Sequence, residues 1–192
     1  MQQALANLKV LDLTQFEAGP SSTMMLAFMG ADVIKIDPPG QGEPGRTLRS
    51  TTPGVDAYYF LLYNANKRGV TLNLKSDEGK ALFIEMAKHA DVVVENFRPG
   101  TLEGWGLGWV ELSRLNPGLV MLRISGYGQS GPYRDRAGFD QVAQGMGGVM
   151  WVTGLPGQGP VRAGIPVADL SAGLFAALGI LTGEMVDHET MR

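Results

Sequence analysis

The chain has 192 residues, of which 44% are hydrophobic and 18% charged, so it can bury a packed core. Sixteen basic residues stand against nineteen acidic ones, and this balance argues against a general binder of nucleic acid or of anionic membranes. The absence of cysteine and the presence of only two histidines exclude disulfides, thiol nucleophiles and a histidine-rich metal centre. No signal peptide is evident, and no uninterrupted apolar stretch reaches the roughly 20 residues of a membrane span. We therefore expect a cytoplasmic protein without a metal site.

The first forty residues predict a strand–helix–strand unit. Lys9–Leu13 and Asp32–Ile36 are the expected strands. Between them, Pro20 stands where a first helical residue is expected, since its fixed φ suits that position. Gly30 is expected to end the helix. A unit of this length implies parallel strands joined by a right-handed crossover.

Strands and helices continue to alternate along the rest of the chain. After a loop at Pro38–Gly54, the aromatic stretch Tyr58–Tyr63 receives no assignment. The remaining expected strands are Val70–Leu74, Asp91–Val94 and Leu119–Ile124. The remaining expected helices are one capped by Ser76, short pieces at Pro99–Trp105 and Trp109–Leu115, and helices at Phe139–Met150 and Ala168–Met185. This alternation predicts one α/β domain over residues 1–192, with a doubly wound and mostly parallel sheet.

Two segments test for a dinucleotide site. Asp37 follows the second strand, where an acidic residue would bind a ribose, but the first turn, Thr14–Gly19, has one glycine. The turn of a dinucleotide site usually has three glycines, because they let a pyrophosphate touch the backbone. Gly126–Gly131 matches GxGxxG after a strand, yet Pro132 and charged residues follow in place of an apolar helix. We therefore disfavour NAD binding and interpret Gly126–Gly131 as a flexible loop, with the lining of a ligand cleft at the carboxyl ends of the strands as the alternative.

Asp169, which precedes an apolar helical run, has two interpretations. Taken alone it is a helix N-cap, worth about 1 kcal/mol. Alternatively, a carboxylate kept ionised by the helix dipole can serve as a covalent nucleophile. Sequence spacing does not choose between the two.

Basic and amide side chains near strand ends also have two interpretations. Val94–Gly100 contains an asparagine and an arginine just after a strand, where such donors suit an anion such as phosphate. The alternative is ordinary turn chemistry. Asn66–Arg68 and Lys75 add positive charge near another strand, and a solvated surface is the expected alternative for them.

Several blocks, taken together and in order, resemble the class III CoA-transferases, the CaiB/BaiF type that includes formyl-CoA transferase and carnitine CoA-transferase. They run from about Leu5 to Ile180 and include LKVLDLT, GADVIKID, NANKRGVTLNLKSDEGK, ADVVVENFRPGTLEGWGLG, ISGYGQSGPYRDRAGFDQVAQGMGG and PVRAGIPVADLSAGLF. The resemblance implies the Rossmann-like large domain of such an enzyme. It also implies that a small domain and a C-terminal return segment are absent, as in a truncated product. Full-length relatives are expected to form an interlocked homodimer, and the isolated chain is expected to expose apolar surface and aggregate.

The resemblance implies transfer of coenzyme A (CoA) from an acyl-CoA to a small carboxylic acid, with no permanently bound cofactor. Asp169 aligns with the catalytic aspartate of the family. It would attack the donor thioester to give an aspartyl–acyl anhydride, and the CoA thiolate would then form an aspartyl–CoA thioester that the acceptor carboxylate resolves. The family's CoA contacts carry over to Glu17, Ala18, Leu72, Asn73, Leu74, Lys75, Asn96, Phe97 and Arg98.

This sequence departs from formyl-CoA transferase at four positions, where that enzyme has glutamine, arginine, arginine and lysine. The residues here are Glu17, Pro38, Gly104 and Ala137. The departures argue against formyl or oxalate specificity.

Two alternatives stand beside the transferase. The α-methylacyl-CoA racemases resemble this chain but carry Gly-His-Asp where it has Gly138-Phe139-Asp140, so one acid/base partner is missing. We therefore favour the transferase over the racemase. The other alternative is a truncated, non-catalytic fragment that binds CoA.

Overall fold

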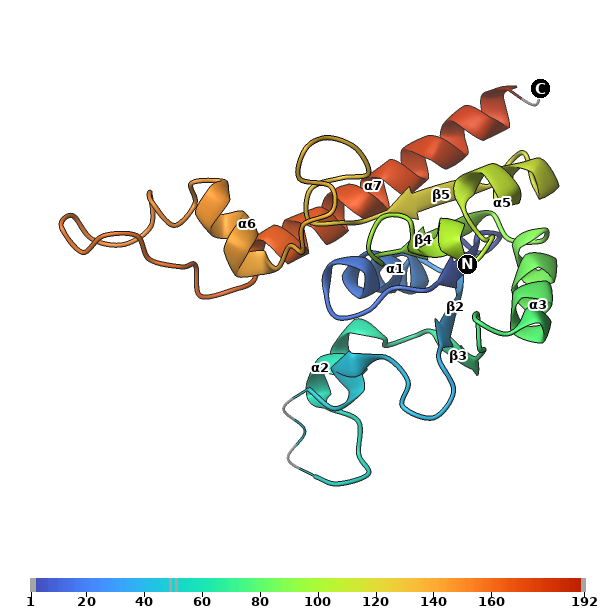
Figure 1. Cartoon of the computed structure of the whole chain (residues 1–192), viewed down its shortest axis with the longest axis horizontal. Helices are drawn as coiled ribbons and strands as arrows, with labels where there is room; N and C mark the ends of the chain where they lie inside the picture. Colours follow the sequence, from blue (N-terminus) through green and yellow to red (C-terminus); the bar gives the residue numbers. More distant parts are fainter. Residues whose placement is uncertain (1–2, 49, 51, 191–192) are drawn as a thin grey trace.

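The computed structural model describes residues 3–48, 50 and 52–190. Its centre is a parallel sheet of five strands in the order β3-β2-β1-β4-β5 (Figure 1). The strands are β1 (Lys9–Asp12), β2 (Asp32–Asp37), β3 (Arg68–Thr71), β4 (Val92–Glu95) and β5 (Val120–Arg123). The predicted α/β class and parallel sheet are therefore confirmed. The strand order reverses between β1 and β4, as it does in Rossmann-like sheets.

The helices lie between the strands and after them. They are α1 (Ala18–Phe28), α2 (Tyr58–Tyr63), α3 (Asp77–Ala87), α4 (Thr101–Gly104), α5 (Trp109–Leu115), α6 (Asp140–Met146) and α7 (Val167–Thr190), with a short 3-10 helix η1 (Pro44–Arg46). The predicted cap of α3 is confirmed, because the Ser76 hydroxyl accepts a hydrogen bond from Gly79 N at 3.1 Å. Helix α1 begins two residues before Pro20, and α6 is shorter than expected.

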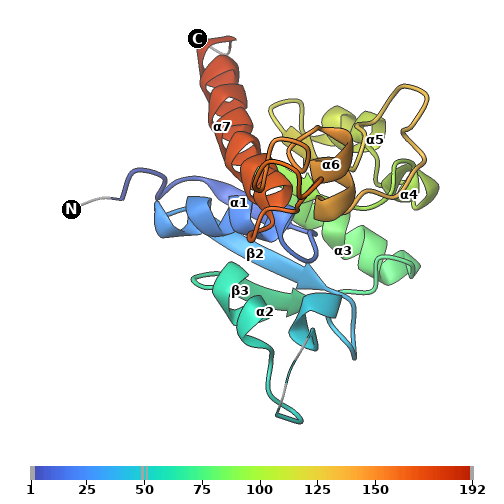
Figure 2. The same cartoon turned by 90° about the vertical axis from the view of Figure 1, so that its left-hand side faces the viewer.

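Helices cover both faces of the sheet, because successive strand residues point to opposite sides. On one face, Val10 and Val33 pack with Leu26 of α1 and Ile180 of α7. On the other face, the residues that alternate with these pack against α3, α4 and α5, where Phe83 is fully buried. Figure 2 shows α7 lying alongside α1 on the first of these faces. The doubly wound, three-layer arrangement follows from two apolar strand faces.

Helix α7 has 24 residues. Its segment Val167–Met185 has the length and the mean composition of a membrane span, although two acidic residues and three glycines interrupt its apolar residues, as noted from the sequence. In this structure α7 packs on α1 and β5, and Ile180 on its inner face is fully buried. The opposite side of α7 exposes large apolar side chains, namely Leu174, Phe175 and Leu178.

Candidate active site

The carboxyl ends of all five strands lie at one edge of the sheet, and the predicted ligand residues follow three of these strands. Glu17 and Ala18 follow β1, Asn96–Arg98 follow β4, and Leu72–Lys75 follow β3. Strands β1 and β4 are neighbours at the point where the strand order reverses, which is where ligand crevices form in such sheets. The structure thus brings the first two groups side by side and leaves the third two strands away, beyond β2.

Asp169 reaches this edge because the start of α7 packs closely against the start of α1. Gly173 permits the close approach, since a Cβ there would collide with Ser21 Oγ and lie 2.8 Å from the Ala18 carbonyl oxygen. A residue with any side chain at this position would push the two helix starts apart. Glycine therefore sets the distance between the turn after β1 and the first turn of α7.

Of the two interpretations of Asp169, the capping one is wrong, because Asp140 caps the helix instead. Asp140 Oδ1 accepts hydrogen bonds from Ala168 N at 2.9 Å and from Asp169 N at 3.4 Å. In the described part of the chain, the Asp169 side chain itself takes part in no hydrogen bond or ion pair. Its carboxylate, partly buried in the first turn of α7, is left available for a ligand.

Three carboxylates gather here, and in the described part of the chain no cation is among the main electrostatic neighbours of Asp169 and Glu17. Burial, followed by the negative charges of Glu17 and Asp140, raises the pKa of Asp169 to about 6. Burial also raises the pKa of Glu17, and the charge of Asp140 adds to this effect. No group of three or more acidic or histidine side chains within the described residues is suited to hold a metal ion. The cluster is therefore a set of partly desolvated, mutually repelling acids.

Helix α2 supplies two tyrosines that sequence reasoning missed. Tyr63 Oη donates to Glu17 Oε1 at 2.6 Å, and Tyr59 Oη lies 3.5 Å from Glu17 Oε2. The two rings pack edge to face with centroids 5.1 Å apart. Burial is the main cause that raises the pKa of both phenols, and Glu17 adds to it, so both remain hydrogen-bond donors at neutral pH. The aromatic stretch 58–63 was the available signal, because residues four apart share one face of a helix.

The turn between β1 and α1 is fixed by a side chain from β2 and by one from the residue that follows β4. Asn96 Oδ1 accepts from Gln15 N at 2.8 Å, and Asn96 Nδ2 donates to Gln15 O at 2.7 Å. Lys35 Nζ donates to the Thr14 carbonyl oxygen. Asn96 thus orders the turn with both polar atoms of its amide, and its contact with CoA stays a prediction.

The other predicted CoA contacts differ in exposure. Lys75 and Arg98 are exposed, and neither forms an ion pair in the described part of the chain, so both cations are available to an anion. Leu74 is buried in the core with α3, and Leu72 and Phe97 pack against the same core. The side chain of Leu74 therefore stabilises the fold. Asn73 Oδ1 accepts a hydrogen bond from Lys75 N at 3.1 Å, which shapes the turn before α3.

The solvated surface expected for the Asn66–Arg68 segment is wrong for Lys67. Its side chain is fully buried, with Nζ 2.9 Å from Asp12 Oδ2 and hydrogen-bonded to the carbonyl oxygen of Pro20 and to Asn64 Oδ1. Burial acts to raise the pKa of Asp12, but the charges of Lys35 and Lys67 and the hydrogen bonds from two threonine hydroxyls outweigh it. The pKa of Asp12 therefore lies far below its usual range. These contacts tie β1, α1 and the end of α2 together beneath the site.

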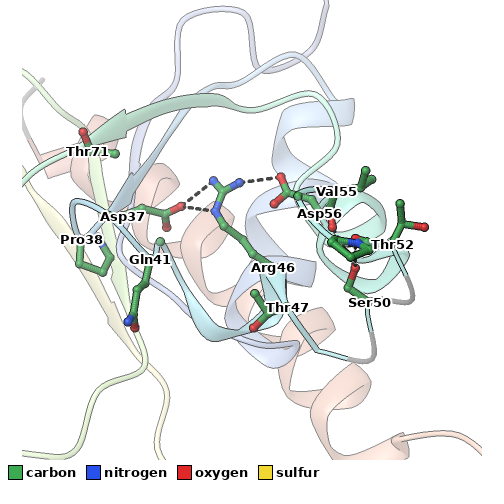
Figure 3. Close-up of a pocket in the computed structure, with 14 residues that line it drawn as sticks. Asp37, Pro38, Gln41, Arg46, Thr47, Ser50, Thr52, Val55, Asp56 and Thr71 are labelled. Carbon is green, nitrogen blue, oxygen red and sulfur yellow. Dashed lines mark hydrogen bonds and ion pairs between the residues drawn. The ribbon is translucent and has the colours of Figure 1, made fainter.

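A pocket of about 690 Å³ lies at the ends of β2 and β3, beside the predicted Leu72 contact (Figure 3). Arg46 crosses it, with Nη2 2.6 Å from Asp37 Oδ2 and Nη1 2.7 Å from Asp56 Oδ2. The Asp37 carboxylate is thus held by an arginine. Neither Asp169 nor Glu17 lines this pocket.

Comparison with known sequences gives close relatives of about twice this length. The chain is 49% identical over 178 residues to a succinyl-CoA–D-citramalate CoA-transferase of Chloroflexus aurantiacus. The matched region covers 92% of this chain and 44% of the relative. It is 40% identical over 186 residues to the human succinyl-CoA:glutarate CoA-transferase, covering 97% of this chain and 42% of the relative. The chain therefore spans less than half the length of these curated relatives.

Solved structures and a family description agree with these relatives. A CAIB/BAIF family protein from Brucella suis superposes with a TM-score of 0.94 at 37% identity, covering 100% of this chain and 52% of that one. A hypothetical protein from Mycobacterium tuberculosis superposes with a TM-score of 0.85 at 36% identity, covering 94% of this chain and 49% of that one. The family described as CoA-transferase family III matches residues 5–190. This chain belongs to CoA-transferase family III.

Proposed function

We propose that this chain is the part of a CoA-transferase that binds acyl-CoA and carries the nucleophile. The observation that supports the proposal best is Asp169, a partly buried carboxylate whose side chain makes no hydrogen bond within the described residues. It lies at the carboxyl edge of the sheet, beside the turn that follows β1. The two named relatives act between succinyl-CoA and a dicarboxylic acid, so we propose small dicarboxylic acids as donor and acceptor.

The proposed chemistry alternates between an anhydride and a thioester at Asp169. A carboxylate oxygen attacks the carbonyl carbon of the donor thioester, and the C–S bond breaks to release the CoA thiolate and leave an aspartyl–acyl anhydride. The thiolate attacks the aspartyl carbonyl, which forms an aspartyl–CoA thioester and frees the donor acid. The acceptor carboxylate then attacks this thioester, which releases the CoA thiolate and leaves an anhydride between Asp169 and the acceptor. The thiolate attacks the acceptor's carbonyl carbon in this anhydride, which forms the new acyl-CoA and releases the Asp169 carboxylate.

The surroundings of Asp169 suit this role. A pKa of about 6 leaves the side chain mostly ionised at neutral pH. It also makes the side chain more basic than a fully solvated aspartate, which favours attack on a carbonyl carbon. Aspartate needs no general base for this step, in agreement with a site built from acids and tyrosines. The exposed Phe139 cannot carry a proton, which counts against the racemase alternative.

For CoA, we propose that exposed cations at the strand ends hold its phosphates. Lys75 follows β3 and Arg98 follows β4, so they approach the edge from either side of β1 and β2. The full-length protein is proposed to act as a homodimer in the cytoplasm. The exposed apolar residues along α7, Leu174 and Phe175 among them, support burial of this face in a larger assembly.

Hydroxylamine trapping tests the nucleophile. The chain is incubated with succinyl-CoA and quenched with hydroxylamine, which converts an aspartyl thioester or anhydride into a hydroxamate, and the digested peptides are read by mass spectrometry. We expect the hydroxamate at Asp169, its loss in Asp169→Asn, and full labelling in Asp135→Asn, a control at an exposed loop position. Binding of CoA without any hydroxamate would contradict the nucleophile and leave a non-catalytic CoA-binding fragment.

A further inference from the structure

The turn after β1 contains a backbone conformation that its residue type disfavours. Phe16 has a φ of +64°, in the left-handed region that glycine, asparagine and aspartate tolerate best. The other positive-φ residue outside glycine in the described chain is Asn66, whose side chain suits this region. A phenylalanine stays in this conformation only where its surroundings hold it, and such positions cluster at functional sites.

A buried carboxylate holds the Phe16 peptide. Glu43, in the loop between β2 and α2, accepts a hydrogen bond from Phe16 N through Oε2 at 2.9 Å. Glu43 is 1% exposed, so water does not compete for this bond. Asn96 fixes the preceding Gln15 peptide but leaves the N–H of Phe16 to Glu43. Glu43 is therefore the side chain that holds the peptide N–H of Phe16 in the turn between β1 and α1.

We propose that Glu43 is a positioning residue that keeps Phe16 left-handed and thereby directs Glu17 and Ala18 into the active site. The inference rests on the proposed function for the role of Glu17 and Ala18, but the hydrogen bond itself does not. Glu17 is the N-cap residue of α1, yet its side chain makes no capping hydrogen bond and turns to Tyr63 instead. The direction of the Phe16 peptide decides this orientation, because Glu17 is the next residue.

The Glu43 carboxylate packs closely against Gly45 in its own loop. A Cβ at Gly45 would collide with Glu43 Oε1, so only glycine leaves room for the carboxylate in its present place. In the described chain this second oxygen has no hydrogen-bond partner. The nearby Lys67 ammonium, whose pKa Glu43 acts to raise, offsets part of the cost of burying the charge. Arg46 ties the same loop to Asp37 at its other end.

Two substitutions at Glu43 separate the hydrogen bond from the charge. Glu43→Ala removes the acceptor, and we expect the Phe16 amide proton to exchange with solvent faster by on the order of tenfold or more, as measured by NMR. In Glu43→Gln the side-chain oxygen still accepts from Phe16 N, so exchange is expected to stay within about threefold of the wild type. CoA affinity, measured by calorimetry on the same chains, is expected to fall on the order of tenfold for Ala and to be rescued by Gln.

Two glycine positions provide independent variants. Phe16→Gly lets residue 16 adopt a positive φ without steric cost. We therefore expect Glu43→Ala to weaken CoA binding less in the Phe16→Gly background than in the wild-type background. Gly45→Ala leaves the carboxylate in the chain but displaces it, and is expected to act in the same direction as Glu43→Ala with a smaller effect. It serves as the readout if Glu43→Ala does not fold.

The outcomes distinguish this proposal from the proposed function. Unchanged Phe16 exchange in Glu43→Ala overturns the hydrogen-bond role, and faster exchange with unchanged CoA affinity overturns the positioning role. Failure of Gln to rescue shows that charge matters instead, and also overturns the proposal. If the wild-type chain binds no CoA, the proposed function fails, together with the positioning part of the inference. The exchange rates still decide whether Glu43 holds Phe16.

Discussion

Two clusters of buried charge lie on the same side of the sheet and differ in what surrounds them. Beneath the site, Asp12 is enclosed by Lys35, Lys67 and hydroxyl donors, and its pKa falls far below the usual range. At the carboxyl edge, burial and the negative charges of Glu17 and Asp140 act on Asp169, and its pKa rises to about 6. The first carboxylate is fixed as an anion by its partners and serves the fold. The second has no ion-pair partner among the described residues, which supports its proposed role as the nucleophile.

The largest expected effect comes from breaking the buried ion pair between Lys67 and Asp12. Lys67→Met leaves Asp12 buried without its nearest cation, and we expect the free energy of unfolding to fall by about 3–5 kcal/mol in a urea titration. The adjacent Arg68→Met serves as a matched control, because Arg68 pairs with Asp32 on the surface, where both side chains are well exposed. Its expected cost is at most about 1 kcal/mol. Equal losses in the two variants would remove the distinction between the clusters.

The next effect concerns the contact that brings the acids together. Gly173→Ala places a methyl group against Ser21 and the Ala18 carbonyl oxygen, and we expect a loss of about 1–3 kcal/mol in stability. Gly179→Ala on the same helix meets open space and is expected to stabilise the chain by about 0.5–1 kcal/mol. Urea titrations of both variants check this, and a neutral Gly173→Ala contradicts the close approach of α1 and α7.

A smaller effect on stability is expected at Asp169, where the substitution stabilises the chain instead of destabilising it. Because folding raises the pKa of Asp169 from 3.8 to about 6, this group favours the folded state at low pH, and that stability is lost as the pH rises through 6. Asparagine imitates the protonated acid. Allowing for partial exposure, Asp169→Asn is expected to stabilise the chain by about 1–2 kcal/mol near pH 8 and by almost nothing near pH 4. Unfolding titrations at both pH values decide this, and equal effects at the two values contradict it.

The smallest effect concerns the coupling between two acids. Glu17→Gln removes a negative charge that acts on Asp169, so the pKa of Asp169 is expected to move back toward its ordinary value. A carbon-13 NMR titration of the Asp169 carboxyl measures the midpoint without any need for catalysis. Glu103→Gln, which removes a charge paired with Arg123 elsewhere, is expected to leave the midpoint unchanged. A midpoint that does not move in Glu17→Gln would show that the charge of Glu17 does not contribute to this pKa.

The sequence predicted the sheet well because its strands are short apolar runs bounded by turns. Strands β1, β2, β4 and β5 lie within one residue of their predicted ends. Strand β3 was misplaced, because the apolar run continues beyond the last paired residue, Thr71, and Leu74 turns into the core with α3. Apolar periodicity reports burial, and it does not separate a paired strand from a buried turn.

The site was harder to predict, because its decisive contacts join residues distant in the sequence. Lys67 finds Asp12 at a separation of 55 residues, and Asp140 caps a helix through Ala168, 28 residues later. Nothing local distinguishes Lys67 from its exposed neighbour Arg68. The position of Asp169 was suggested by the family resemblance, but its freedom from a capping role became visible only with the fold.

The tethering of α6 to α7 has a consequence for how this fold can vary. Besides the Asp140 cap, Gln144 Oε1 accepts a hydrogen bond from Ala163 N at 2.9 Å and Gln144 Nε2 donates to the Ile165 carbonyl oxygen at 3.2 Å. The long exposed segment between the two helices is therefore anchored where it rejoins the fold. Residues can be inserted, lost or exchanged at its tip while the start of α7, and with it Asp169, keeps its place, so evolution can reshape the surroundings of the candidate site without rebuilding its centre.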